Sequence, residues 1–204
     1  MANVQQNIIK YYTKVTNEAL VNLKDEKQFR FKMRLNNRNL MMQSEDHLIS
    51  VYKSAGGTMP FNPEVKKMID DYKKSMLDMH TLAVKDYNKT LAELKQTKTI
   101  EDKQRILDKY AEKGISGFKS KSGATWNLET YSNMYFTHMN NELIRQGQLD
   151  HIKGDLIQIS THNTKCNLCK PYEGKILTRK QLESARSNGL FHPNCLHLII
   201  EVGV

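Results

Sequence analysis

The sequence of 204 residues is poor in cysteine, contains no long apolar run, and has fewer acidic than basic residues. Its three cysteines, an odd number, argue against a disulfide scaffold and are typical of a chain made in a reducing cytosol. No stretch approaches the roughly 20 apolar residues of a membrane span, and the first ten residues lack the apolar core of a signal peptide. The sequence therefore predicts neither membrane insertion nor secretion.

The shortage of acidic residues gives the chain a net charge of +9, from 31 Lys and Arg against 22 Asp and Glu. Such an excess favours a polyanionic neighbour such as nucleic acid. It is densest in a basic segment that consists of Lys24, Lys27, Arg30, Lys32, Arg34 and Arg38. These cations could bind DNA phosphates, with Phe29 and Phe31 stacking on bases. The alternative is a helix with solvated cations, of which Phe29, Met33 and Leu40 face a core.

Residues 1–113 are predicted to be mainly helical. Apolar residues recur at spacings of three and four from Val65 to Leu82 and again around Ile106 and Tyr110, and the same spacing occurs earlier, at residues 11–23. Residues 54–63 hold two Gly and two Pro, which predicts a loop between helices. These helices could form a bundle or an extended arm.

Residues 114–204 are predicted to form a small α+β domain, so the chain as a whole is expected to be α+β. Two short strands should turn within residues 114–126, and a helix capped by Asn127 should follow and end at Gly147 or Gly154. Strands are expected at residues 156–160, 175–177 and 196–202, with a helix over residues 179–187 that Thr178 caps.

All three cysteines fall in one thirty-residue stretch, in a pattern typical of a structural zinc site. A Cys-x-x-Cys turn can direct two sulfurs at one tetrahedral ion, and a distant pair with the same spacing can close the site. The predicted ligands are Cys166, Cys169, His192 and Cys195. His162 and His197 are alternatives that the sequence does not separate from His192. Such a site can contribute about 10–16 kcal/mol of apparent binding free energy to folding.

The cysteine pattern has three other interpretations. A thioredoxin-like redox pair is disfavoured because Pro171 and Gly174 follow the Cys-x-x-Cys too closely for a helix. An HNH-type, metal-dependent nuclease would need an Asp-His pair on a preceding strand, which the sequence lacks. The cysteines could also be reduced and packed without a metal. The sequence has no Gly-rich phosphate loop, Gly-x-Ser-x-Gly or His-Glu-x-x-His motif, so it predicts no enzyme.

Among nearby carboxylates, Asp150 and Asp155 are expected to be solvated loop charges. Glu173 is the exception. If it lay beside His162 and an open metal position, a hydrolytic role would be favoured, whereas four protein ligands that close the site would exclude that role.

The C-terminal motifs resemble a known family. Cys166 and Cys169 are followed by residues 172–176 (Tyr-Glu-Gly-Lys-Ile), by a helix and by residues 192–195 (His-Pro-Asn-Cys). In this pattern the chain is similar to the minor capsid proteins of tailed bacteriophages, the phage minor capsid protein 2 group and the wider phage Mu protein F-like head morphogenesis proteins. The similarity covers roughly residues 105–200. One departure is Leu196, which stands where a basic residue is usual.

The resemblance implies a virion protein of the phage head that is made in the host cytoplasm and present in few copies. It implies partners at the portal vertex, namely the portal protein and other head proteins. It also implies non-specific contact with packaged double-stranded DNA, with which the protein could be ejected, and no small-molecule substrate. The alternative that needs no virion is a sequence-nonspecific nucleic-acid-binding protein, whose affinity would fall steeply with salt.

Overall fold

The computed structural model describes residues 26–113, 116–119 and 123–202. Its first part is helical, as predicted, with α2 at Glu26–Ser54, α3 at Pro63–Gln96 and α4 at Ile100–Lys113. The helix expected over residues 11–23 lies outside the described residues. The predicted Gly/Pro loop joins α2 to α3, and the N–H of Val65 donates to Oδ1 of Asn62 at 2.9 Å. Asn62 therefore caps α3, and Pro63 takes its first position.

Helix α3 buries one continuous apolar stripe along its whole length. Successive buried side chains lie three or four residues apart, so they fall on one side of a 3.6-residue helix. Each of them is at most 6% exposed: Val65, Ile69, Tyr72, Met76, Met79, Ala83, Tyr87, Leu91 and Leu94. The frequent methionines of the helical section thus contribute to its core.

The second part begins with the predicted hairpin, in which β1 (Ser116–Lys119) and β2 (Thr125–Asn127) pair antiparallel. Helix α5 follows at Leu128–His151, and the N–H of Thr130 donates to the capping Oδ1 of Asn127 at 2.8 Å. The expectation that Gly147 could end this helix is wrong. Residue 147 lies within α5, and a Cβ there would be 2.5 Å from the carbonyl oxygen of Tyr52 in α2. Glycine is therefore needed for the close approach of the two backbones.

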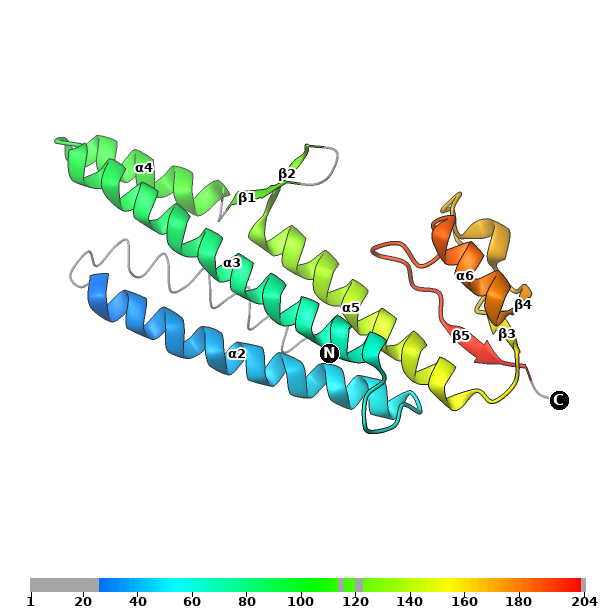
Figure 1. Ribbon diagram of the computed structural model, residues 1–204. Coiled ribbons are helices and arrows are strands. Elements are labelled where there is room, and N and C mark those ends of the chain that lie inside the picture. The colour runs from blue at the N-terminus through cyan, green and yellow to red at the C-terminus, as the bar shows by residue number, and fades with distance from the viewer. Residues whose placement is uncertain (1–25, 114–115, 120–122, 203–204) are drawn as a thin grey trace. The chain divides into compact units, whose positions relative to one another are not determined.

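The C-terminal sheet is three-stranded and antiparallel, in the order β4-β3-β5. Its elements are β3 (Leu156–Ile159), the short 3-10 helix η1 (Lys170–Tyr172), β4 (Ile176–Thr178), α6 (Arg179–Ser187) and β5 (Ile199–Glu201). Helix α6 lies against the sheet (Figure 1). This arrangement confirms the α+β class. The core between them contains Cys169 and Cys195 together with Ile157, Ile159 and Leu182.

The closing strand is shorter than the predicted residues 196–202. The carbonyls of Cys195 and His197 accept hydrogen bonds from the side chain of Arg145 rather than from a neighbouring strand. Regular pairing therefore begins at Ile159↔Ile199.

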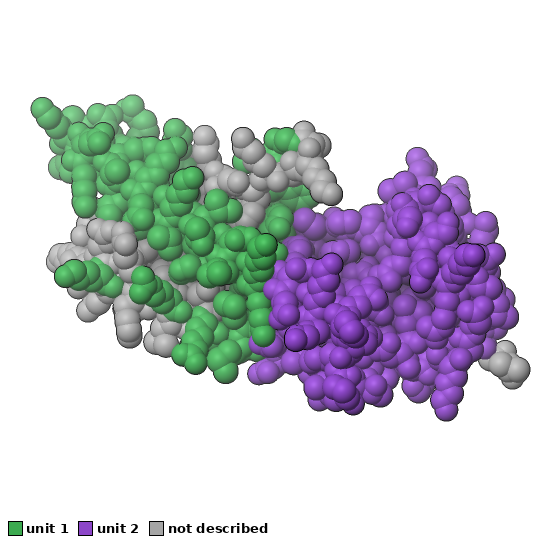
Figure 2. Space-filling view, in the orientation of Figure 1, with its two compact units in different colours: residues 1–44, 72–133 green, residues 45–71, 134–204 purple. Residues whose placement is uncertain are grey.

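The chain divides into two compact units, which Figure 2 colours separately. Unit 1 comprises residues 1–44 and 72–133, and unit 2 comprises residues 45–71 and 134–204. Each unit therefore combines two stretches of chain. The predicted division into residues 1–113 and 114–204 stays a proposal about which segments fold alone. Among the described helices, none is long and apolar enough to cross a membrane.

Candidate metal centre

The Cys-x-x-Cys segment forms a tight turn between β3 and η1. The N–H groups of Cys169 and Lys170 both donate to the carbonyl of Cys166, at 3.2 and 2.9 Å. The N–H of Cys166 donates to Oγ1 of Thr164 at 3.1 Å. Gly174, with φ of +70°, then returns the chain to β4. Local backbone hydrogen bonds thus fix the turn that carries both sulfurs.

The second pair of predicted ligands lies on another tight turn after α6. The N–H of Cys195 donates to the carbonyl of His192 at 2.9 Å, and Asn194 between them has a φ of +69°. Asparagine tolerates this left-handed conformation better than most residues. Sequence spacing therefore predicted correctly that two separate turns would present these residue types.

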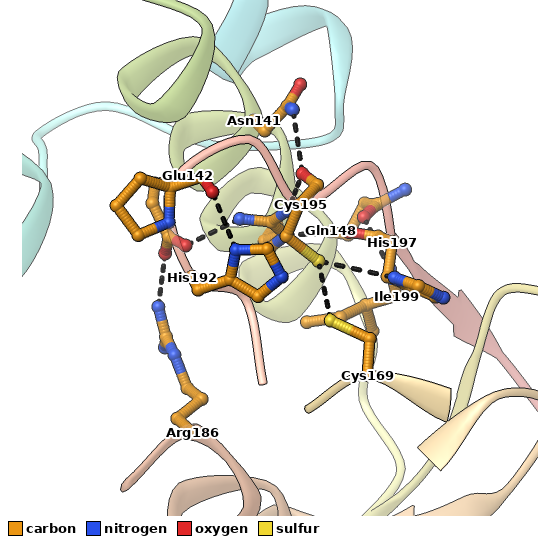
Figure 3. Close-up of polar contacts among 11 residues, drawn as sticks. Asn141, Glu142, Gln148, Cys169, Arg186, His192, Cys195, His197 and Ile199 are labelled. Atoms are coloured by element: carbon orange, nitrogen blue, oxygen red, sulfur yellow. Dashed lines mark hydrogen bonds and ion pairs between the residues drawn. The ribbon is translucent and has the colours of Figure 1, made fainter. Parts of the chain in front are cut away.

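The two turns bring together five potential metal donors. Nε2 of His192 lies 3.2 Å from Sγ of Cys166, and Sγ of Cys169 lies 3.6 Å from Sγ of Cys195. Nδ1 of His197 lies 3.2 Å from the same Cys195 sulfur (Figure 3). With Zn–S bonds of about 2.3 Å, the sulfurs of a tetrahedral site lie about 3.7 Å apart, close to these separations.

The donors form two overlapping groups, within each of which all donor atoms lie within 4.8 Å of one another. One group consists of Cys166, Cys169 and His192, and the other of Cys169, Cys195 and His197. Cys169 belongs to both. Three of the predicted ligands thus lie in the first group, and Cys195 lies in the second with His197, which the sequence had left as an alternative.

The two thiols of the Cys-x-x-Cys turn have opposite pKa shifts. Backbone N–H groups of Cys169 and Leu168, which face the Cys166 sulfur, lower the pKa of Cys166 to about 7. Burial and the neighbouring thiols of Cys195 and Cys166 raise the pKa of Cys169 to about 12. A divalent cation among the sulfurs would reverse the second shift, because it stabilises thiolates. Three thiols and imidazole nitrogens are a donor set that suits zinc.

Glu173 joins the candidate centre through His197. Its Oε1 lies 2.8 Å from Nε2 of His197 and accepts from the backbone N–H of His162 at 2.8 Å. Although burial acts to raise it, the pKa of Glu173 is lowered by the N–H groups of His162 and Thr164 and by His197. The imidazole of His162 instead faces Oγ of Ser160 at 2.8 Å and belongs to neither donor group.

Arg145 of α5 fixes the loop that carries Cys195 and His197. It is completely buried, and it donates from Nε to the carbonyl of His197 and from Nη2 to the carbonyl of Cys195, both at 2.8 Å. Its Nη1 pairs with Oε1 of Glu142 at 2.5 Å, and its guanidinium lies 4.1 Å from the centre of the Phe191 ring. The buried charge is thus compensated by a carboxylate, two carbonyls and an aromatic face.

This clamp was not predicted from the sequence. Three polar residues of α5, Asn140, Arg145 and Gln146, are at most 5% exposed. Asn141 also donates from Nδ2 to the carbonyl of Cys195, at 3.0 Å. Four polar residues close together on one helix, upstream of a cysteine motif, are the signal that would have suggested docking of a loop.

The other carboxylates have structural partners. Asp150 was expected to be a solvated loop charge, but it accepts hydrogen bonds from the hydroxyl of Tyr52 and the amide of Asn62. The backbone N–H of Arg179 donates to two oxygens of Asp155. The side-chain Oδ1 lies 3.4 Å away and the backbone carbonyl oxygen lies 3.2 Å away.

Half of the basic segment can be placed. Lys27, Arg34 and Arg38 are exposed on α2, and Leu40 is 8% exposed at the end of the segment. Lys24 lies outside the described residues, and the side chains of Arg30 and Lys32 are among those not described. The exposed cations fit both interpretations of this segment, DNA contact and a solvated helix face.

A family model matches the chain. The model of a family described as phage minor capsid protein 2 matches residues 3–202, nearly the whole chain. The match therefore also includes the helical part, which the motif-based resemblance over residues 105–200 did not cover. No curated protein and no solved structure matches the chain.

Proposed function

The chain belongs to the phage minor capsid protein 2 family, and we propose on that basis that it is a low-copy structural protein at the portal vertex of a phage head. Membership makes it a minor capsid protein with other head proteins as partners. Portal contact, association with packaged DNA and ejection with that DNA are the finer parts of the proposal. The single observation that carries it is the family match over residues 3–202.

Quantitative mass spectrometry of purified virions tests this role. We expect the chain at a few copies per particle, well below the major capsid protein, and cross-linked to the portal protein in DNA-filled heads. A copy number equal to that of the major capsid protein, or cross-links confined to the capsid shell, would contradict placement at the portal vertex. Comparing particles before and after DNA release tests the ejection step separately.

We further propose that the basic segment contacts DNA through its phosphates without reading bases. The support is its charge, the exposure of Lys27, Arg34 and Arg38, and the absence from the sequence of a recognition helix or zinc finger of known spacing. Each phosphate contact contributes about 0.9 to the slope of log affinity against log salt concentration. Neutralising the three exposed cations should therefore reduce that slope by about 2–3.

Fluorescence anisotropy with duplexes of two unrelated sequences is the measurement. The matched control neutralises three exposed lysines of α3 instead: Lys66, Lys67 and Lys74. An equal loss of slope in both triple variants would mean that only overall charge matters. An unchanged slope in the first variant would refute DNA contact by the basic segment.

We also propose that zinc pins the C-terminal sheet by binding three cysteines and one histidine, for which sequence spacing favours His192. Cys169 and Cys195 lie within the core that joins the sheet to α6, so a bound ion would cross-link the two turns through that core. Four protein ligands would close the site, as in structural rather than catalytic zinc centres. The proposed role is therefore structural, in keeping with membership of a capsid protein family.

A further inference from the structure

The two overlapping groups together offer five donors, whereas a structural zinc ion takes four, so one histidine is surplus. We infer that Nδ1 of His197, held in orientation by Glu173, is the fourth ligand beside Cys166, Cys169 and Cys195. This inference deepens the proposed zinc site and rests on it. It assigns to His197 the fourth ligand position, for which sequence spacing favours His192.

Burial separates the two histidines. His197 is 2% exposed, and both cysteines of its donor group, Cys169 and Cys195, are at most 4% exposed. His192 is only partly buried, and Cys166, whose Sγ lies 3.2 Å from Nε2 of His192, is also partly buried. A structural ion is best retained where its ligands are shielded from water and held by surrounding packing. The group that contains His197 meets that condition more fully.

The hydrogen bond to Glu173 gives His197 the tautomer that a metal requires. An ionised carboxylate accepts only, so Nε2 of His197 carries the proton that it donates to Glu173. In the neutral ring the lone pair is then on Nδ1, which faces Sγ of Cys195 at 3.2 Å. A carboxylate behind a histidine is the usual arrangement around zinc, and it fixes both the ring orientation and the basicity of the ligating nitrogen.

His192 has a less firmly held hydrogen-bond partner. Nδ1 of His192 faces the carbonyl of the adjacent Pro193 at 2.6 Å, so the lone pair of this ring lies on Nε2, the nitrogen near the sulfur of Cys166. The tautomer alone therefore does not distinguish the two rings. The difference is that Glu173 comes from a separate segment and is itself held by backbone N–H groups, whereas Pro193 is part of the same turn.

The backbone also aims His197 at the cluster. Side chains two residues apart in an extended segment point to the same side. Cys195 and His197 are both buried, whereas Leu196 between them is 62% exposed. Arg145 holds the carbonyls of both ligands at 2.8 Å, so the pair is fixed on one rigid stretch. Arg145 and Glu173 are accordingly positioning residues of the site.

Zinc affinity of the full chain, measured by competition with a chromophoric chelator, tests the assignment. His197→Ala should lower the affinity at least about 100-fold, and Glu173→Gln should lower it about 10–100-fold, as removal of an outer partner typically does. His192→Ala is the matched control, and it should change affinity less than about threefold. In the cobalt-substituted protein, His192→Ala should preserve the ligand-field spectrum, because the ligands are unchanged.

A fourth variant guards against simple misfolding of His197→Ala. His197→Cys places a sulfur near the position of Nδ1, so it should restore tight binding and strengthen the thiolate-to-cobalt absorption. Loss of zinc in His192→Ala with retention in His197→Ala would overturn the assignment while leaving the zinc proposal intact. Absence of zinc from the wild-type chain would overturn both, without touching the family membership or the proposed place in the head.

Discussion

Replacing Arg145 by methionine removes the charge that joins α5 to the loop of the candidate metal centre. Methionine keeps much of the apolar volume of the side chain but none of its donors. The carbonyl of His197 loses its 2.8 Å hydrogen bond from Nε, and Glu142 loses the partner of Oε1. The face of Phe191 also loses the guanidinium that lies 4.1 Å away.

The expected cost follows from these contacts. Breaking a buried ion pair by removing one partner typically costs about 3–5 kcal/mol. Two remaining contacts reduce the expected loss of stability. Glu142 keeps its ion pair with Arg186, and the carbonyl of Cys195 keeps its hydrogen bond from the amide of Asn141 at 3.0 Å. We therefore expect Arg145→Met to lower the free energy of unfolding by about 3 kcal/mol.

Urea unfolding of the full chain, followed by circular dichroism with excess zinc, measures the change. Arg105→Met is the matched control, because Arg105 is 80% exposed and its ion pair with Asp102 lies at the surface. Its effect should stay within about 0.5 kcal/mol. A loss below about 1 kcal/mol for Arg145→Met, or a loss equal to that of the control, would refute the interpretation of Arg145 as a clamp.

Two further substitutions test packing and pH dependence in unit 2. Gly147→Ala should destabilise the chain by about 1–3 kcal/mol in the same urea assay, because its Cβ would lie 2.5 Å from the carbonyl oxygen of Tyr52 and 2.8 Å from Cβ of Ala55. Gly154→Ala, whose Cβ meets its nearest atom at 4.0 Å, should change stability little, and equal effects would contradict the close packing. Burial and the carboxylate of Asp150 raise the pKa of Tyr52 to about 12, so the folded state holds the phenolic proton more tightly than the unfolded state. Stability should therefore fall as the pH rises from about 10 towards 12, and Tyr52→Phe should reduce this decline in urea titrations at a series of alkaline pH values; an unchanged decline would refute the role of Tyr52.

Local signals predicted most of the fold. Asn127 and Thr178 were recognised as helix caps from their residue type and place, and each accepts the expected backbone hydrogen bond. Such signals act within a few residues, so the sequence displays them directly. The need for glycine at residue 147 depends instead on how closely α2 approaches α5, and no local sequence pattern encodes that distance.

The candidate site was only partly predictable for the same reason. The spacing of Cys166, Cys169 and Cys195 revealed the cluster, because turns of fixed length present sulfurs together. The role of Arg145 in holding the Cys195 loop could not be predicted, because a charged residue on a helix is usually solvated. Its burial here depends on a loop fifty residues away. Choosing among histidines likewise required knowing which ring Glu173 contacts.

Metal content of the purified chain, measured by native mass spectrometry beside a Cys166→Ser, Cys169→Ser double variant, tests the zinc-pinned structure most directly. We expect the mass of one zinc ion on each wild-type chain, and loss of the ion with unfolding of the C-terminal sheet in the double variant. A wild-type chain without metal, together with a double variant that unfolds at the same urea concentration, would contradict the metal centre.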